Sequence, residues 1–154
     1  KIKSFVLGGH GDSMVAMLGS TEVDGKKIND LVKEGKLSQE RLDQIVDRTK
    51  KGGAEIVKYL EKGSAFYAPA ASGVEMAECY IKDLKKQLPC AVHLKGEYGT
   101  NDIYAGVPVI IGSKGVEKVI ELDLSAEEKK NFDNSIKAVK ELFDAAKKID
   151  PDLQ

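Results

Sequence analysis

The stretch that decides the fold is residues 107–122, which read Val-Pro-Val-Ile-Ile-Gly-Ser-Lys-Gly-Val-Glu-Lys-Val-Ile-Glu-Leu. An apolar run at 107–111 is followed by Gly-Ser-Lys-Gly at 112–115 and by a second run at 116–122. Two such runs joined by a short, glycine-bounded turn predict a β-hairpin. The pattern therefore favours antiparallel strand pairing.

The segments around this hairpin add strands and helices without a regular strand–helix–strand alternation. Residues 90–94 predict a strand, with Pro89 separating it from the preceding helix. Residues 3–7 predict a short buried strand, and residues 14–23 a weaker one. Because the strands come in adjacent pairs and the helices come separately, the predicted class is α+β, with antiparallel sheet and hairpins packed against long helices.

Four helices are predicted, each from its own start or stop signal. The signals are residues 27–33 closed by Gly35, Ser38 as a cap, a Ser72–Glu75 capping box and a Ser125–Glu128 capping box. Gly52-Gly53 interrupts the second helix, where each interior glycine costs about 1 kcal/mol relative to alanine. We therefore expect a kink there, or close approach by another backbone.

Apolar residues at helical spacing predict an inward face on each long helix. They are Leu42, Ile45, Val46, Ile56, Val57 and Leu60 on the second helix, Val74, Ala77, Ile81 and Leu84 on the third, and Phe132, Ile136, Val139, Leu142 and Phe143 on the fourth. The last helix is expected to stop at Asp150-Pro151, because proline disfavours a helical residue before it. Residues 1–154 are predicted to form a single domain, as their number allows.

Composition argues against several classes of function. The chain carries 24 Lys plus Arg against 25 Asp plus Glu, for a formal net charge of −1. This balance argues against a nucleic-acid partner, which attracts basic proteins. No apolar run is long enough to span a membrane. Of the 24 cationic residues, only Arg41 and Arg48 are arginines. Bidentate binding of a carboxylate favours a guanidinium group, so the chain has few residues suited to hold a carboxylate ligand.

The two cysteines, Cys79 and Cys90, match neither a zinc framework nor a disulfide scaffold. We expect them to be buried small apolar side chains in a reducing compartment, the cytoplasm, and we expect no metal site.

His10 is the residue best placed for chemistry. It follows the predicted strand at 3–7, and glycines on both sides let another group approach closely. An imidazole on a loop at a strand end suits general acid/base catalysis, while a surface histidine in a glycine-rich turn stays open as the alternative. Asp12 lies too close in sequence to orient the ring, and the G-x-G at 9–11 lacks the third glycine of a dinucleotide fingerprint. His93 is interpreted as solvent-facing.

Six segments, in order, resemble the NAD-dependent malate and lactate dehydrogenase family. They are residues 6–15, 48–57, 63–72, 96–99, 106–112 and 115–122. The first, Val6-Leu7-Gly8-Gly9-His10-Gly11-Asp12-Ser13-Met14-Val15, resembles the family's catalytic-histidine segment. The resemblance spans nearly the whole chain but only the family's C-terminal, substrate-binding half. Nothing in the chain resembles the Rossmann domain that forms the family's first half.

By this resemblance, His10 is the general acid/base that takes the hydroxyl proton of a 2-hydroxy acid as hydride leaves C2 for NAD. The residues implied to lie near substrate or cofactor are Gly9, Gly11, Ser64, Ala65 and Pro69. The family's orienting aspartate and substrate-binding arginines lie upstream of the histidine, which agrees with their absence here. Gly9 favours malate, because many lactate enzymes carry Glu at that position, and lactate stays open.

The resemblance also implies partners. They are NAD bound mainly by an upstream Rossmann domain, a small 2-hydroxy or 2-oxo dicarboxylic acid, and further copies of the intact enzyme in a dimer or tetramer. Since the chain lacks an initiator Met and the family's first half, we expect part of a longer protein, inactive alone. The alternative is a non-catalytic assembly module that keeps the fold. The polar segment at 19–27, which departs from the family pattern, favours this alternative.

Overall fold

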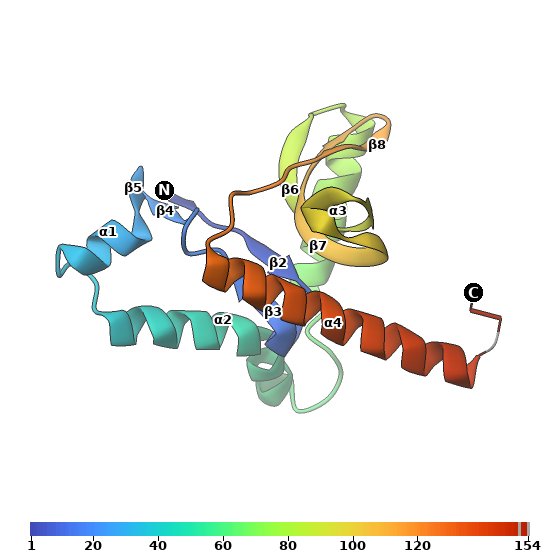
Figure 1. Ribbon diagram of the computed structural model, residues 1–154, viewed down its shortest axis with the longest axis horizontal. Coiled ribbons are helices and arrows are strands. Elements are labelled where there is room, and N and C mark those ends of the chain that lie inside the picture. Colours follow the sequence, from blue (N-terminus) through green and yellow to red (C-terminus); the bar gives the residue numbers. More distant parts are fainter. Residues whose placement is uncertain (151, 154) are drawn as a thin grey trace.

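The structure, a computed structural model, describes residues 1–150, 152 and 153 (Figure 1). The elements in that range are β1 (Ile2–Lys3), β2 (Val6–Gly8), η1 (Gly11–Ser13), β3 (Met14–Ala16), β4 (Glu22–Val23), β5 (Lys26–Lys27), α1 (Ile28–Lys33), α2 (Gln39–Leu60), α3 (Tyr67–Ile81), β6 (Lys86–Lys95), η2 (Glu97–Gly99), β7 (Asn101–Gly112), β8 (Gly115–Val119) and α4 (Ala126–Ile149). Within these residues, no helix combines the length and apolarity that crossing a membrane requires.

The main sheet has the strand order β3-β2-β7-β6, with β8 also paired to β7. Every strand pairing among the described residues is antiparallel. The predicted hairpin is present, because Gly112 and Gly115 face each other across the turn between β7 and β8. The α+β class with antiparallel pairing is therefore confirmed.

Strand β6, which precedes the β7–β8 hairpin, is longer than the predicted strand at 90–94. Pro89 lies inside β6, directly opposite Pro108 of β7, so the expectation that it separates the strand from the preceding helix is wrong. The Pro108 carbonyl accepts a hydrogen bond from the N–H of Ile120, on the side of β7 away from β6. The backbone groups of Pro89 and Pro108 therefore point away from each other, so no hydrogen bond between β6 and β7 is lost at this pair. Strand β6 is also an edge strand, where a sheet tolerates proline.

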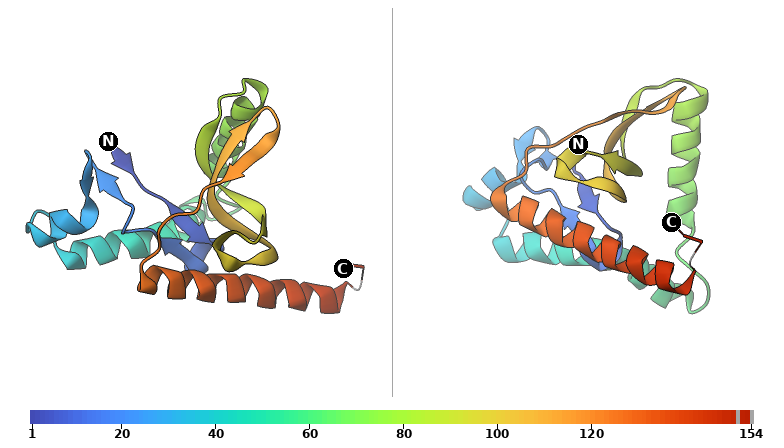
Figure 2. Two further views of the ribbon diagram at one scale, coloured as in Figure 1. Left: turned by 45° about the horizontal axis from the view of Figure 1, so that its top comes forward. Right: turned by 45° about the vertical axis from the view of Figure 1, so that its right-hand side comes forward.

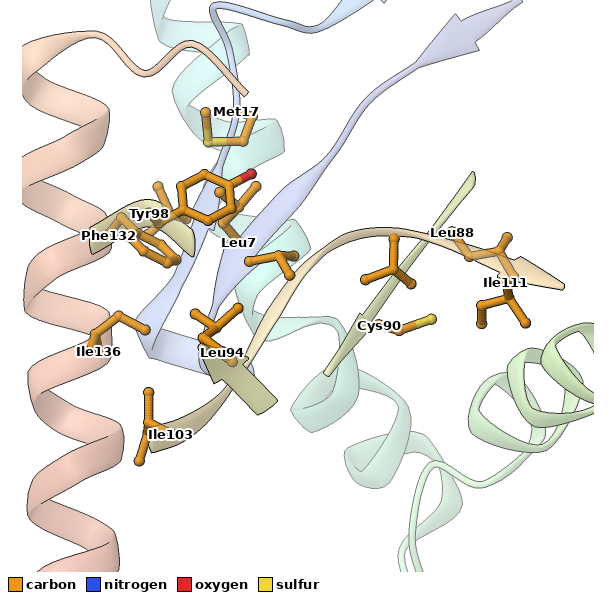
Figure 3. Packing of buried hydrophobic residues seen from close by; sticks show 14 of the residues in the cluster. Leu7, Met17, Leu88, Cys90, Leu94, Tyr98, Ile103, Ile111, Phe132 and Ile136 are labelled. Carbon is orange, nitrogen blue, oxygen red and sulfur yellow. The ribbon is translucent and has the colours of Figure 1, made fainter. Parts of the chain in front are cut away.

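The core lies where the main sheet meets the first half of α4 (Figure 3). Phe132 and Ile136 of α4 are buried there, and the Phe132 ring centroid lies 5.1 Å from that of Tyr98. Its largest buried members are Phe132, Leu7, Met17, Leu94, Val107, Val109 and Cys79. The Ser125–Glu128 capping box at the start of α4 is present as predicted. At the other end Asp150 is the C-cap, while Pro151 lies outside the described residues.

The predicted strand bounds near the amino terminus are wrong. Residues 3–7 divide into β1 and β2, and residues 14–23 divide into β3 and β4. A turn ends β3, since the buried Thr21 donates its N–H to Leu18 (3.3 Å) and its hydroxyl to the Met17 carbonyl (2.7 Å). Strands β1, β4 and β5 form a separate small sheet, and the predicted helix at 27–33 is found as α1.

Helix α3 begins at Tyr67, five residues before the predicted cap. The Ser72–Glu75 capping box is therefore wrong, and Glu75 instead forms an ion pair with Lys86 of β6. Pro69 falls in the first turn of α3, where a helix tolerates proline. Of this helix only Cys79 is buried, whereas Ile81 of the predicted inward stripe is 78% exposed.

The predicted inward faces of α2 and α4 are also covered only in part. Leu42 is the buried residue of α2, whose Ser38 cap is present as predicted. On α4 the apolar stripe is buried at Phe132 and Ile136 but exposed at Leu142, and the second half of the helix runs beyond the sheet (Figures 1 and 2). Periodicity identifies an apolar face, but not the partner that covers it.

Gly52-Gly53 does not end α2, which remains a single helix from Gln39 to Leu60. A Cβ added at either glycine would meet no atom within 4 Å. Within the described part of the chain, no other backbone therefore comes close to these glycines, which was one of the two expected explanations for them.

Candidate functional site

His10 lies at the tip of the hairpin formed by β2 and β3. The strands are in register from Val6 opposite Ala16 to Gly8 opposite Met14, and the single turn η1 closes the end between them. His10 takes the N-cap position of η1 with extended backbone and an exposed side chain. The predicted placement, an imidazole on a loop at a strand end, is what the structure shows.

The glycines before His10 allow three elements to crowd its backbone. A Cβ added to Gly8 would lie 2.2 Å from the Ser135 hydroxyl of α4, and one added to Gly9 would lie 2.4 Å from the Ser13 hydroxyl. A Cβ on Gly106 of β7 would lie 2.9 Å from the Gly8 carbonyl oxygen. Gly8 also has φ +89°, a conformation that favours glycine. The segment leading into His10 is therefore enclosed by β7, η1 and α4.

A pocket of about 280 Å³ adjoins His10. Its walls come from β2 and from the middle of β6 and β7, and the lining residues are Val6, Leu7, Gly8, Gly9, His10, Met14, Pro89, Cys90, Ala91, Tyr104, Ala105 and Gly106. The lining is mostly apolar, with the His10 and Tyr104 side chains as its polar groups. A small organic molecule fits this volume, and the His10 imidazole is the group in the lining that suits general acid/base catalysis.

The His10 ring makes no hydrogen bond to the residues that the structure describes. Asp12, two residues away, does not orient it, as the sequence predicted. Within the described residues, both ring nitrogens are therefore without a hydrogen-bond partner.

Both arginines are occupied on the surface of α2. Arg48 donates from Nε and Nη2 to the two carboxylate oxygens of Glu55, at 3.0 and 2.9 Å. Hydrogen bonding and attraction to Glu55 raise the pKa of Arg48. Arg41 donates to Gln44 at 3.3 Å. Neither guanidinium group lines the His10 pocket.

The other residues implied by the resemblance are placed apart from one another. Gly9 lines the His10 pocket, and Gly11 with φ +74° begins η1 just beyond it. Ser64 and Ala65 lie in the connection between α2 and α3, and Pro69 lies in the first turn of α3. None of these last three lines the His10 pocket within the described residues.

His93 is less exposed than expected. Its ring stands edge-on to Tyr104 with centroids 5.3 Å apart, and it borders a groove whose other wall is α4. Cys79 and Cys90 are buried free thiols in the core cluster, as predicted for small apolar side chains. Among residues 1–150 and 152–153, no three His, Cys, Asp or Glu side chains gather to hold a metal ion.

The residue that sequence reasoning missed is Ser135. Its hydroxyl accepts a hydrogen bond from the Gly9 N–H at 2.8 Å. The available signal was its place on α4 directly before Ile136 and three residues after Phe132, which are both buried.

The His10 pocket does not fit the phosphates of a dinucleotide. Phosphates need cations or a set of free N–H groups, whereas the lining of the His10 pocket contains neither lysine nor arginine. The small apolar wall beside His10 suits instead a small, largely apolar group.

The sheet, the long helix across it and the hairpin carrying His10 together define an α+β C-terminal domain of the dehydrogenase class. The family model for the lactate/malate dehydrogenase, alpha/beta C-terminal domain matches residues 1–149, and the chain belongs to this family.

Comparison with individual proteins agrees. The chain is 67% identical to the malate dehydrogenase of Pelagibacter ubique (strain HTCC1062) over 153 residues, which is 99% of this chain and 48% of the relative. Two solved structures are each 40% identical to this chain. One is lactate dehydrogenase from Eimeria maxima with NADH and oxamate, with a TM-score of 0.92 over 97% of this chain and 47% of that one. The other is malate dehydrogenase from Salinibacter ruber, with a TM-score of 0.89 over 99% of this chain and 48% of that one. The chain thus spans about half the length of the relatives it matches.

Proposed function

We propose that this chain is the C-terminal, substrate-binding half of an NAD-dependent malate dehydrogenase, with residues 1–154 forming one domain and His10 acting as its general acid/base. The observation that carries the proposal is the exposed His10 at the end of an enclosed hairpin, beside a small apolar pocket. The 67% identity to a malate dehydrogenase and Gly9 before the histidine both favour malate over lactate as the substrate.

In the oxidation direction, the His10 imidazole takes the proton from the C2 hydroxyl of malate as that carbon becomes a carbonyl. In the reverse direction, it returns the proton to oxaloacetate. Bound NAD supplies the hydride acceptor. The apolar wall of the pocket limits water around the reacting carbon, which strengthens the electrostatic effects of groups that hold the substrate. Gly9, Gly11, Ser64, Ala65 and Pro69 are the residues proposed to border substrate or cofactor.

The half-chain alone is proposed to be inactive. Its two arginines are held on α2, and His10 has no orienting carboxylate among the described residues. Those groups, together with most of the NAD site, are proposed to come from an upstream Rossmann half, in an enzyme that is a dimer or tetramer.

The test is a joined protein, in which the amino-terminal half of the Pelagibacter ubique relative is placed before Lys1. The joined protein is expected to reduce oxaloacetate with NADH, while the isolated chain shows no turnover. Turnover by the pure isolated chain would contradict its proposed incompleteness, and an inactive but folded joined protein that binds NADH would contradict the proposed function.

A second candidate function, assembly without catalysis, is favoured by the exposed apolar side chains. Tyr67 and Ile81 of α3 and Leu142 of α4 are between 73% and 78% exposed, so they are free to contact another chain. A stable oligomer of the isolated chain by light scattering, together with an inactive joined protein, is the result that this candidate predicts.

A further inference from the structure

We infer that Ser135 of α4 is a positioning residue for His10, acting through its hydrogen bond with the Gly9 N–H. The inference rests on the proposed role of His10 and adds the residue that fixes the backbone beneath that histidine. Ser135 lies 126 positions after Gly9 in the sequence, so these two residues meet only because α4 crosses the end of the β2–β3 hairpin (Figure 2).

The contact between α4 and the hairpin is close. The Ser135 hydroxyl lies 2.8 Å from the Gly9 nitrogen, and Ser135 is 3% exposed. A Cβ on Gly8 would lie 2.2 Å from this hydroxyl, so only glycine lets the helix come this near. Val139, one turn further along α4, would lie 3.2 Å from a Cβ on Gly9. Helix and hairpin therefore meet at the two residues that precede His10.

Ser135 is itself held by the core. Phe132 and Ile136 on either side of it are 0% and 5% exposed, and the Phe132 ring packs against Tyr98 (Figure 3). The capping box at Ser125 fixes the start of the helix. The hydroxyl is thus a fixed acceptor on a rigid element, while His10 lies in an exposed turn. The hydrogen bond from the Gly9 N–H to this hydroxyl ties the residue before His10 to the rigid core.

Removing the hydroxyl would leave the Gly9 N–H in a crowded site without its acceptor. An unsatisfied buried donor favours a shift of the backbone toward water. A shift there moves His10, the next residue, and misplacement of a reacting group by about 1 Å is enough to cost up to about a hundredfold in rate. Because the substrate and NAD are proposed to be held largely by the upstream half, their binding should be affected less than the chemical step.

The experiment compares Ser135→Ala with Thr21→Val in the joined protein. Thr21 is also a buried hydroxyl with a 2.7 Å hydrogen bond, but it lies in the turn before β4, away from the His10 pocket. Ser135→Ala is expected to lower kcat about tenfold or more and to change the KM values for malate and NAD less than twofold. Thr21→Val is expected to lower stability and to leave kcat within twofold.

Equal kcat values for Ser135→Ala and the parent protein, with the same loss of stability as Thr21→Val, would overturn the inference. If Ser135→Ala does not fold, amide exchange at Gly9 in the parent protein decides: strong protection supports the inference, and exchange at the rate of a free amide overturns it. His10→Asn separates this inference from the proposed function. Retained activity in His10→Asn refutes the function itself, whereas lost activity there with unchanged activity in Ser135→Ala refutes only the positioning role.

Discussion

The carboxylate of Glu128 accepts a hydrogen bond from the backbone N–H of Gly19 at 2.9 Å. The same side chain accepts the Ser125 N–H at 2.9 Å, so one residue both caps α4 and ties it to the segment that follows β3. A Cβ on Gly19 would lie 3.1 Å from the Glu128 carboxylate, which explains why a small residue stands there. Helix α4 therefore contacts both ends of the β2–β3 hairpin: Glu128 binds Gly19 just beyond its open end, and Ser135 binds Gly9 at its tip.

Glu128→Ala should therefore lower the free energy of unfolding by about 1–3 kcal/mol, because it removes a cap and leaves the Gly19 N–H unpaired. Urea unfolding of the isolated chain measures the change. Glu127→Ala, in the same turn but exposed, is the matched control and should change stability by less than about 0.5 kcal/mol. Equal effects of the two substitutions would show that the Gly19 contact contributes nothing.

The contribution of Glu128 should also depend on pH. Burial raises the pKa of its carboxyl, but hydrogen bonds from the Gly19 and Ser125 backbone outweigh burial and hold the pKa below its usual value of 4.5. A lowered folded-state pKa means that the unfolded state binds the proton more readily. The stabilisation is therefore complete above pH 4.5 and is lost as the pH falls through the folded pKa. The stability difference between the parent chain and Glu128→Gln should shrink as the pH is lowered from 7 to 3, and a difference that grows over this range would contradict the assignment.

Gly52→Ala and Gly53→Ala should each stabilise the isolated chain by about 0.5–1 kcal/mol. Neither glycine has positive φ, and an added Cβ meets no atom within 4 Å, so alanine gains its higher helix propensity at no steric cost. Thermal unfolding followed by circular dichroism measures this gain. A loss of stability in the isolated chain would show that the open space beside these glycines is occupied in solution.

Tyr98→Phe should destabilise the chain by about 1–3 kcal/mol, although it removes a single oxygen. The Tyr98 hydroxyl donates to the Ile120 carbonyl at 2.7 Å and accepts the Leu122 N–H at 3.0 Å. These bonds hold the segment between β8 and α4 against the core. Tyr104→Phe, at a largely exposed tyrosine, is the control and should be nearly neutral. A neutral Tyr98→Phe would refute the importance of this link.

Local signals in the sequence were sufficient for the hairpin turn at Gly112 and Gly115, the caps at Ser38 and Ser125, and the loop position of His10. Each depends on a few neighbouring residues, so sequence carries the information. The burial of α2, α3 and the end of α4 was predicted wrongly, because an apolar stripe has the same spacing whether its cover belongs to this chain or to another. Ser135 was missed for a related reason: its partner Gly9 lies far away in sequence, and only the folded chain brings them together.

The two cysteines should be protected from thiol reagents in the folded chain. Burial raises the pKa of the Cys90 thiol, and Cys79 is fully buried, so neither thiol is freely accessible to a reagent. Ellman's reagent should therefore react with no more than traces of thiol in native buffer and with both thiols in urea. Rapid reaction in native buffer, at the rate of a free cysteine, would contradict the burial of these side chains.

The central claim is that His10 moves the proton in malate oxidation. The most direct measurement is kcat for NAD-linked malate oxidation by the joined protein and by its His10→Asn variant, with NADH binding measured for both to confirm an intact fold. General acid/base catalysis contributes about 10²–10⁴-fold, so kcat of the variant should fall by about that factor while NADH binding is unchanged. A variant that keeps kcat within twofold of the parent protein would contradict the account.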